Sequence, residues 1–130
     1  MSMLVFILLC TLLIPLTMVG FGLVCQKHPP KDINGVYGYR TMRSMQNQET
    51  WDFAHQVCGR VWRKVGLILL IATFIMNFIL YFMKNSISMD IEFCLSIEIF
   101  VQTFILLLSI IPVEKALKNN FDDKGNRIEK

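Results

Sequence analysis

The sequence predicts an all-α membrane protein that crosses the bilayer three times. Hydrophobic residues make up 54% of the chain and charged residues only 18%, whereas ordinary soluble domains contain about 45–50% and about 25%. The apolar residues also gather in three long runs that carry few charges. Because the chain has 130 residues, we expect these runs to form a single membrane domain.

The first predicted span covers residues 3–25. It contains 23 residues without a charge, and such a helix is about 34 Å long, enough to cross a hydrocarbon core of about 30 Å. A cleaved signal peptide would have a basic start, a shorter apolar core and a small-residue cleavage site, which this segment lacks. Pro15 lies in the middle of the span and is expected to kink the helix.

A loop and an amphipathic helix are predicted to follow. Residues 26–46 contain two prolines and two glycines, which predict an irregular loop with a tight turn at Asn34 and Gly35. In residues 47–64, apolar side chains recur with helical spacing after an N-cap at Asn47. We expect this helix to lie along the cytoplasmic interface and to lead into the second span. Its apolar face comprises Trp51, Ala54, Cys58, Val61, Trp62 and Val65.

The second and third spans, 65–83 and 91–113, differ in polarity. Asn77 is the one strongly polar side chain of the second span, whereas the third contains Glu98 and Gln102. A charged carboxylate at the depth of Glu98 costs a few kcal/mol, so this group should be neutral, paired or facing water. Asn77 and Gln102 are its candidate partners. The alternatives are a hydrogen-bonded pair that stabilises helix packing and a proton or ligand pathway.

The orientation follows from the positions of Lys and Arg, which are enriched in cytoplasmic loops. The polar segment of 26–64 and the tail of 114–130 are basic, while the connection between the last two spans carries only Lys84. Three crossings place both basic segments on one side. The sequence therefore predicts an outer N-terminus and a cytoplasmic C-terminus, with 114–130 as a solvated, partly disordered tail.

No catalytic or metal-binding constellation is predicted. The four cysteines form no C-x-x-C pair and accompany no histidine cluster, so we expect free thiols; they are Cys10, Cys25, Cys58 and Cys94. The stretch from Asp122 to Asn126 lacks the alternating ligands and the closing Glu of a calcium loop. The sequence predicts no metal, no cofactor and no enzymatic activity.

A signature runs from the loop into the amphipathic helix. Its residues are Gly38, Tyr39, Arg40, Thr41, Ser44, Asn47, Trp51, His55 and Gly59. This pattern resembles that of the SdpI family, bacterial membrane proteins named for immunity to the sporulation-delaying toxin. Met42 stands where many relatives have Pro. The resemblance also implies a short form without the additional N-terminal membrane half that larger members carry.

Most signature side chains invite a structural interpretation. Gly38 is expected to adopt a positive φ, and Gly59 to allow close approach of a neighbouring helix. Trp51 and Trp62 are interpreted as interfacial anchors, with packing of Trp51 over the loop as the alternative. His55 lies at the margin of the apolar face, which favours a satisfied interfacial histidine over a catalytic base or pH sensor.

The family resemblance implies a cell-membrane protein that gives immunity or resistance to a membrane-active antimicrobial peptide, such as a bacteriocin. A toxin arriving from outside would meet the connection of 84–90 or the helix faces in the bilayer. One alternative is a signalling platform on which Arg40 and the amphipathic helix sequester a cytosolic regulator. Another is a small transporter or channel subunit that uses Glu98 and assembles as a homo-oligomer. The expected partners are thus the lipid bilayer, a peptide toxin and a cytosolic regulator, without direct nucleic-acid contact.

Overall fold

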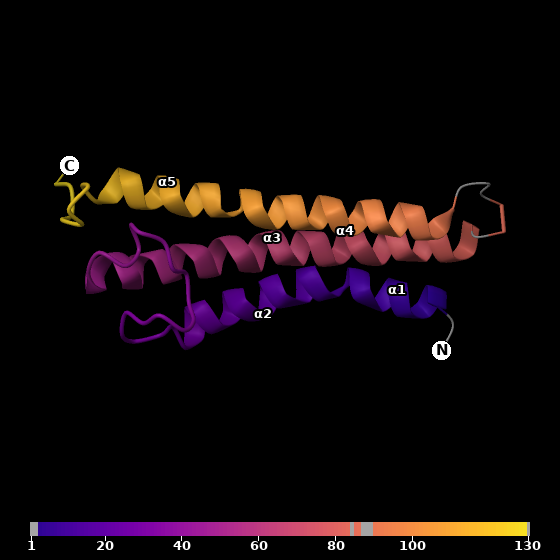
Figure 1. The fold of residues 1–130 in the computed structure, drawn as a ribbon, viewed down its shortest axis with the longest axis horizontal. Coiled ribbons are helices and arrows are strands. Elements are labelled where there is room, and N and C mark those ends of the chain that lie inside the picture. The colour runs from indigo at the N-terminus through magenta and orange to yellow at the C-terminus, as the bar shows by residue number, and fades with distance from the viewer. Residues whose placement is uncertain (1–2, 84, 87–89, 130) are drawn as a thin grey trace.

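Three long helical rods lie side by side in the computed structural model, which describes residues 3–83, 85–86 and 90–129 (Figure 1). In this part of the chain the helices are α1 (Met3–Thr11), α2 (Leu13–Lys27), α3 (Gln48–Met83), α4 (Ile91–Leu108) and α5 (Ile110–Asn120). The first rod comprises α1 and α2, and the third comprises α4 and α5. All three rods are long and apolar enough to cross a membrane. The predicted all-α fold with three membrane-crossing helices is confirmed.

The first and third rods are each interrupted shortly before a proline. Pro15 has no N–H to donate to the Thr11 carbonyl, and its ring crowds that carbonyl. Accordingly, α1 ends at Thr11 and α2 begins after Leu12. Pro112 stands in the same relation to the break at Ser109. The kink predicted for Pro15 is therefore present, but it lies about one turn before the proline.

The predicted amphipathic helix and the second span form one uninterrupted helix, α3. Asn47 caps its start, as predicted: Asn47 Oδ1 accepts the Thr50 N–H at 2.9 Å, and Thr50 Oγ1 accepts the Asn47 N–H at 3.1 Å. This reciprocal arrangement satisfies N–H groups that the helix leaves without a partner. Figure 1 shows α3 as one continuous rod, so its amphipathic first half continues the axis of the span.

The apolar face of this first half is covered by protein rather than by lipid. The loop, α3 and α5 share a buried cluster formed by Tyr39, Ala54, Cys58, Val113, Leu117 and Phe121. Trp51 is 0% exposed, so the expectation of an interfacial anchor is wrong for this residue. Trp62 is half-buried and lies with its ring centroid 5.0 Å from that of Phe21.

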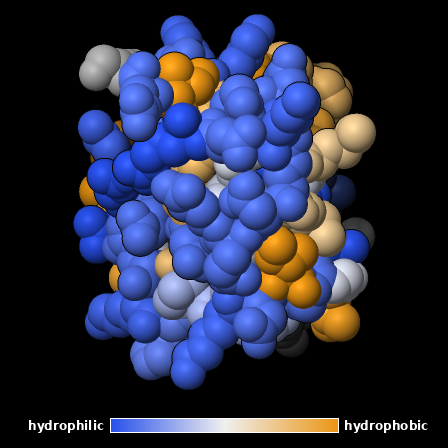
Figure 2. Space-filling model, turned by 90° about the vertical axis from the view of Figure 1, so that its left-hand side faces the viewer, coloured by the Kyte–Doolittle hydropathy of each residue, from blue (hydrophilic) through white to orange (hydrophobic). Residues whose placement is uncertain are grey.

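The bundle has one strongly polar end. The loop after α2, the start of α3 and the segment after α5 meet there, while α1 begins at the opposite end (Figure 1). Figure 2 shows hydrophilic residues covering most of this end. Residues 85, 86 and 90 of the predicted connection of 84–90 lie at the other end, and residues 84 and 87–89 are outside the described residues. The two basic segments thus share one end, as three crossings require.

The segment predicted as a tail, 114–130, is ordered over its described part. Residues 114–120 continue α5, and the chain then folds back so that Phe121 and Arg127 form an antiparallel bridge. The expectation of a partly disordered tail is therefore wrong for residues 114–129. Local hydrogen bonds explain the difference, because they replace the solvation of the turn's backbone.

Candidate functional site

Two side chains of α3, Trp51 and His55, hold the loop against the helix. Trp51 Nε1 donates to the Pro30 carbonyl at 2.8 Å, and His55 Nε2 accepts the Tyr39 N–H at 2.9 Å. Both side chains are 0% exposed, and their ring centroids lie 4.4 Å apart. Since residues four apart lie on one helix face, the pair forms a continuous clamp across the loop.

The hydrogen bonds of His55 fix its protonation. The Tyr39 amide can only donate, so Nε2 is unprotonated. The proton is on Nδ1, which lies 2.7 Å from the Trp51 carbonyl. Burial is the main influence and lowers the pKa of this imidazole, while the Trp51 carbonyl and Asp52 act in the opposite direction. Both ring nitrogens are occupied within the fold, which agrees with the interpretation of His55 as a satisfied histidine.

Gly38 makes the close contact between loop and clamp possible. Its φ is +116°, a conformation that favours glycine, as predicted. A Cβ at this position would lie 2.5 Å from His55 Nε2 and 3.1 Å from Pro30 Cγ. A side chain would therefore collide with the imidazole that binds the next residue.

Thr41 and Ser44 close the turn that follows. The buried Ser44 hydroxyl donates to the Tyr39 carbonyl at 2.8 Å and accepts the Thr41 N–H at 2.8 Å. In return, Thr41 Oγ1 accepts the Ser44 N–H at 3.2 Å. These bonds satisfy backbone groups that a buried loop would otherwise leave unpaired.

Tyr39 links the loop to the third rod. Its hydroxyl donates to Glu114 Oε1 at 2.7 Å. Burial, followed by the hydrogen bond and the charge of Glu114, raises the pKa of the Tyr39 hydroxyl well above its usual range. The phenol therefore stays a donor at physiological pH, and the signature joins α3, the loop and α5.

Arg40 is the signature residue that points outward. It is exposed, and its hydrogen bond in the described structure is a long one, 3.4 Å from Nη1 to the Val36 carbonyl. A groove of about 420 Å³ lies beside it, with Phe21, Trp62 and Ile110 in its wall. The Arg40 guanidinium is consequently available to a group outside the fold.

Three glycines form a close seam between α2 and α3. A Cβ on Gly59 would lie 2.9 Å from the Gly22 carbonyl oxygen, and one on Gly22 would lie 2.6 Å from the Arg63 nitrogen. A Cβ on Gly66 would lie 2.9 Å from the Val19 nitrogen. The close approach predicted at Gly59 is confirmed, while the sequence interpretation missed Gly22 and Gly66. Gly59 and Gly66 lie seven residues apart on one face of α3, and this spacing of small residues is the signal that identifies the seam.

The intramembrane polar residues divide into two groups. Asn77 Nδ2 donates to Thr11 Oγ1 at 2.9 Å, so the proposed pairing of Asn77 with Glu98 is wrong. Gln102 Nε2 instead donates to Thr73 Oγ1 at 2.8 Å and, over 3.4 Å, to Glu98 Oε1. The expected contact between Glu98 and Gln102 is present, although the shorter bond goes to a threonine that the sequence interpretation did not single out.

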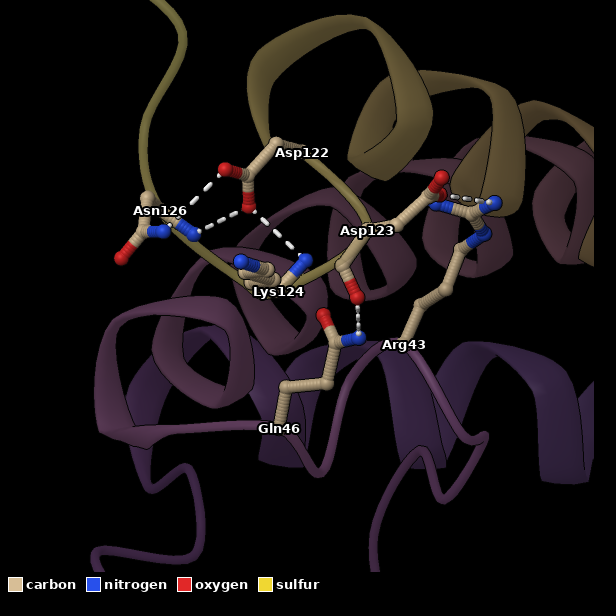
Figure 3. A network of polar contacts seen from close by, with 6 residues as sticks. All are labelled: Arg43, Gln46, Asp122, Asp123, Lys124 and Asn126. Carbon is tan, nitrogen blue, oxygen red and sulfur yellow. Dashed lines mark hydrogen bonds and ion pairs between the residues drawn. The ribbon is translucent and has the colours of Figure 1, made fainter.

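The segment after α5 docks on the end of the loop, which sequence reasoning also missed. Arg43 Nη2 lies 3.2 Å from Asp123 Oδ1, and Gln46 Nε2 donates to the Asp123 carbonyl at 2.7 Å (Figure 3). Asn47 Nδ2 donates to the Gly125 carbonyl at 2.7 Å. The docked segment therefore contacts the residue that caps α3.

An internal network shapes this segment. Asp122 Oδ1 accepts the N–H groups of Lys124 at 2.9 Å and of Asn126 at 2.8 Å (Figure 3). The hydrogen bonds from Asn126 are the main cause that lowers the pKa of the Asp122 carboxyl. Asp122 thus organises a turn rather than a calcium loop.

No group of three or more His, Cys, Asp or Glu side chains within the described residues is arranged to hold a metal ion. The four cysteines are free thiols, two of them buried. The site is thus built from backbone hydrogen bonds, aromatic packing and one outward-pointing guanidinium.

Comparison with known proteins identifies the family of this chain. The model of the SdpI/YfhL protein family matches residues 31–113, from the loop to the end of the third predicted span. The uncharacterized protein YfhL of Bacillus subtilis (strain 168) is 40% identical over 52 residues, which are 40% of this chain and 47% of that relative. The alignment thus covers about half of the relative's length, and no solved structure matches the chain. Because the family model covers most of the sequence and includes the whole clamp, the chain belongs to the SdpI/YfhL family of membrane proteins.

Proposed function

We propose that this protein protects the cell that makes it against a membrane-active antimicrobial peptide by binding the peptide within the bilayer. The main support is the match to the SdpI/YfhL family over residues 31–113, a family whose resemblance implies toxin immunity. The matched region includes the clamp of Trp51 and His55, which organises the polar end.

The proposed orientation favours capture inside the membrane. The basic loop and the basic C-terminal segment share the polar end (Figure 1), and the excess of Lys and Arg supports a cytoplasmic location for that end. A peptide arriving from outside would then reach the apolar helix faces before it reached the loop.

Expression in a toxin-sensitive strain tests this function. Cells that express the wild-type chain should survive a panel of membrane-active peptides better than cells with an empty vector. His55→Leu should lose protection because the loop loses the acceptor of the Tyr39 N–H. His28→Leu is the matched control, since His28 is exposed. Equal killing of vector-bearing and wild-type cells by every peptide would reject the proposal.

A second candidate function is the sequestration of a cytosolic regulator at the polar end. The exposed guanidinium of Arg40, held on an ordered loop, supports it because Arg binds carboxylates and phosphates through two parallel hydrogen bonds. A cytosolic partner should be retained by the wild type and by Arg60→Ala, which alters another exposed arginine, but released by Arg40→Ala. Retention by all three proteins would contradict this function.

A further inference from the structure

A groove of about 500 Å³ lies between α3 and α4, within the membrane-crossing part of the bundle. It extends from Leu69 to Leu80 on α3 and from Cys94 to Ile105 on α4. At 1.5 Å per residue, each wall is about 17 Å long, which corresponds to roughly three turns of a helix. The groove is therefore long enough to receive one helical segment.

The wall is apolar except near its middle. Thr73, Glu98 and Gln102 contribute polar groups there, and Cys94 contributes a thiol. Among the residues that the structure describes, no Lys, Arg or His lines the groove. The hydrogen-bonding groups are thus confined to one short stretch of an otherwise hydrocarbon-like surface.

Two oxygen atoms of this polar stretch are buried without a hydrogen-bond partner among the described residues, Glu98 Oε2 and Gln102 Oε1. The Gln102 side chain is 2% exposed, and its amide nitrogen is already directed at Thr73 and Glu98. Buried acceptors without donors are unfavourable in a medium that lacks water. An occupant that brings a donor would satisfy them.

We infer that the groove binds an apolar peptide helix that carries one basic or amide-bearing side chain near its middle. This inference rests on the proposed function and specifies which peptides the protein recognises. The donor of the peptide pairs with Glu98 Oε2 and Gln102 Oε1 after a small shift of these side chains. A basic donor also forms a neutral pair with the Glu98 carboxylate, which lowers the cost of both charges in hydrocarbon.

Hydrogen-bond complementarity favours a peptide helix over two other possible occupants of the groove, a lipid acyl chain and a second copy of the protein. A lipid acyl chain would cover the apolar wall but would leave both oxygens unpaired. A second copy joined through the same groove by a two-fold axis would present the same surface and would bring no Lys, Arg or His to Glu98, because none of the described residues that line the groove is basic. An amphipathic segment of another chain supplies both the apolar surface and the missing donor.

Two synthetic helices test the inference. Each has about 20 residues of Leu and Ala, the length of one membrane crossing, and the central residue is Lys in one peptide and Leu in the other. Energy transfer from labelled protein to labelled peptide is measured in vesicles of phosphatidylethanolamine and phosphatidylglycerol. The Lys peptide should bind the wild-type protein about tenfold more tightly, as expected for one well-placed hydrogen bond or ion pair in a membrane.

Three variants of the protein test whether the peptides bind in the groove. Glu98→Leu should bring the two peptides to equal affinity. Ala72→Phe, which fills the groove, should weaken binding of both. Ile75→Phe places the same side chain at an exposed position outside the groove and should leave both affinities unchanged.

Several outcomes would overturn the inference. One is equal affinity of the wild type for the two peptides, and another is a Lys preference that survives both Glu98→Leu and Ala72→Phe. Energy transfer between protein copies without peptide, lost in Ala72→Phe, would assign the groove to a second copy. A labelled lipid that occupies the groove and is not displaced by the Lys peptide would assign it to lipid.

The survival assay separates this inference from the proposed function. Protection by the wild type together with absent Lys preference would reject the groove and keep the function. A preference for the Lys peptide without any protection would keep the groove as a peptide-binding site and reject the proposed function.

Discussion

His55 Nε2 accepts the N–H of Tyr39 at 2.9 Å, across 16 positions of sequence and inside the buried part of the polar end. The adjacent Gly38 lies so close that a Cβ there would be 2.5 Å from the same nitrogen. One imidazole therefore determines where the loop returns to α3. It can do so only in its neutral form, because a protonated Nε2 has no lone pair for the amide.

Stability should depend on pH through His55. Burial lowers the pKa of the folded imidazole below its ordinary 6.5, so the unfolded chain binds a proton more readily than the folded one. The stabilisation is complete above that ordinary value and is lost progressively as the pH falls towards the folded-state pKa. Thermal unfolding of purified protein in detergent should show a lower midpoint at pH 5.5 than at pH 7.5.

A matched pair of histidine variants assigns this pH effect. His28→Gln changes an exposed histidine and should keep the pH dependence. His55→Gln should have a lower midpoint at neutral pH and a flatter profile between the two pH values. A profile for His55→Gln that parallels the wild type would assign the effect to other groups.

Gly38→Ala should destabilise the polar end by about 1–3 kcal/mol, the usual cost of a strained backbone position. The new methyl group meets the clamp, and the φ of +116° disfavours alanine. Gly35→Ala is the control, because a Cβ at that position has nothing within 4 Å. Chemical unfolding monitored by Trp fluorescence measures the difference. Equal stability of the two variants would show that the close contact between Gly38 and His55 contributes little to the free energy of unfolding.

The features that local patterns predict agree with the structure. Long apolar runs with few charges predict three crossing helices because their length and composition suffice. Asn47 was identified as an N-cap and Gly38 as a positive-φ residue because each depends on the backbone of a few neighbouring residues. These features need no knowledge of how the helices are arranged.

Apart from the close approach at Gly59, the features that depend on helix arrangement are missed by the sequence interpretation or are wrong. Helical spacing showed that Trp51 belongs to an apolar face but not whether lipid or protein covers that face. Asn77 bonds to Thr11 rather than to Glu98 because rotation and register of the helices decide which polar groups meet. The ion pair between Arg43 and Asp123 joins positions 80 residues apart. A single sequence contains no pattern that predicts such a contact.

Gly22→Ala should weaken the packing of α2 on α3. Its methyl group would lie 2.6 Å from the Arg63 nitrogen, and such overpacking against backbone typically costs about 1–3 kcal/mol. Gly20→Ala, two residues away on the same helix, has nothing within 4 Å of the new Cβ and should be tolerated. Resistance to unfolding by sodium dodecyl sulfate separates the two. Equal resistance of Gly22→Ala and Gly20→Ala would mean that α2 and α3 can move slightly apart without a loss of stability.

Thr73→Val should destabilise the contact between α3 and α4 by about 0.5–1.5 kcal/mol, the range found for hydrogen bonds between membrane helices. The variant keeps the shape of the side chain but removes the acceptor of the Gln102 amide at 2.8 Å. Thr103→Val is the control, because its exposed hydroxyl donates to a carbonyl of its own helix. Resistance to unfolding by sodium dodecyl sulfate measures the effect. A loss of stability in Thr103→Val as large as that in Thr73→Val would contradict the prediction.

Gly125→Ala should release the C-terminal segment from the loop. Gly125 has a φ of +82°, and a Cβ there would lie 2.7 Å from Asn47 Nδ2, the atom that donates to the Gly125 carbonyl. Lys124→Ala is the neighbouring control, since its side chain is exposed and its N–H bond to Asp122 is retained.

Amide hydrogen exchange in detergent measures this release. Residues 121–128 and the loop end at 43–47 should exchange faster in Gly125→Ala than in the wild type, because their mutual hydrogen bonds open together. Exchange in the membrane-crossing part of α3 should stay slow, since those bonds lie within the helix. Faster exchange in 121–128 alone, with 43–47 still protected, would contradict this prediction. The contact of the C-terminal segment would then contribute nothing to the order of the loop, and the clamp of Trp51 and His55 alone would hold the signature residues in place.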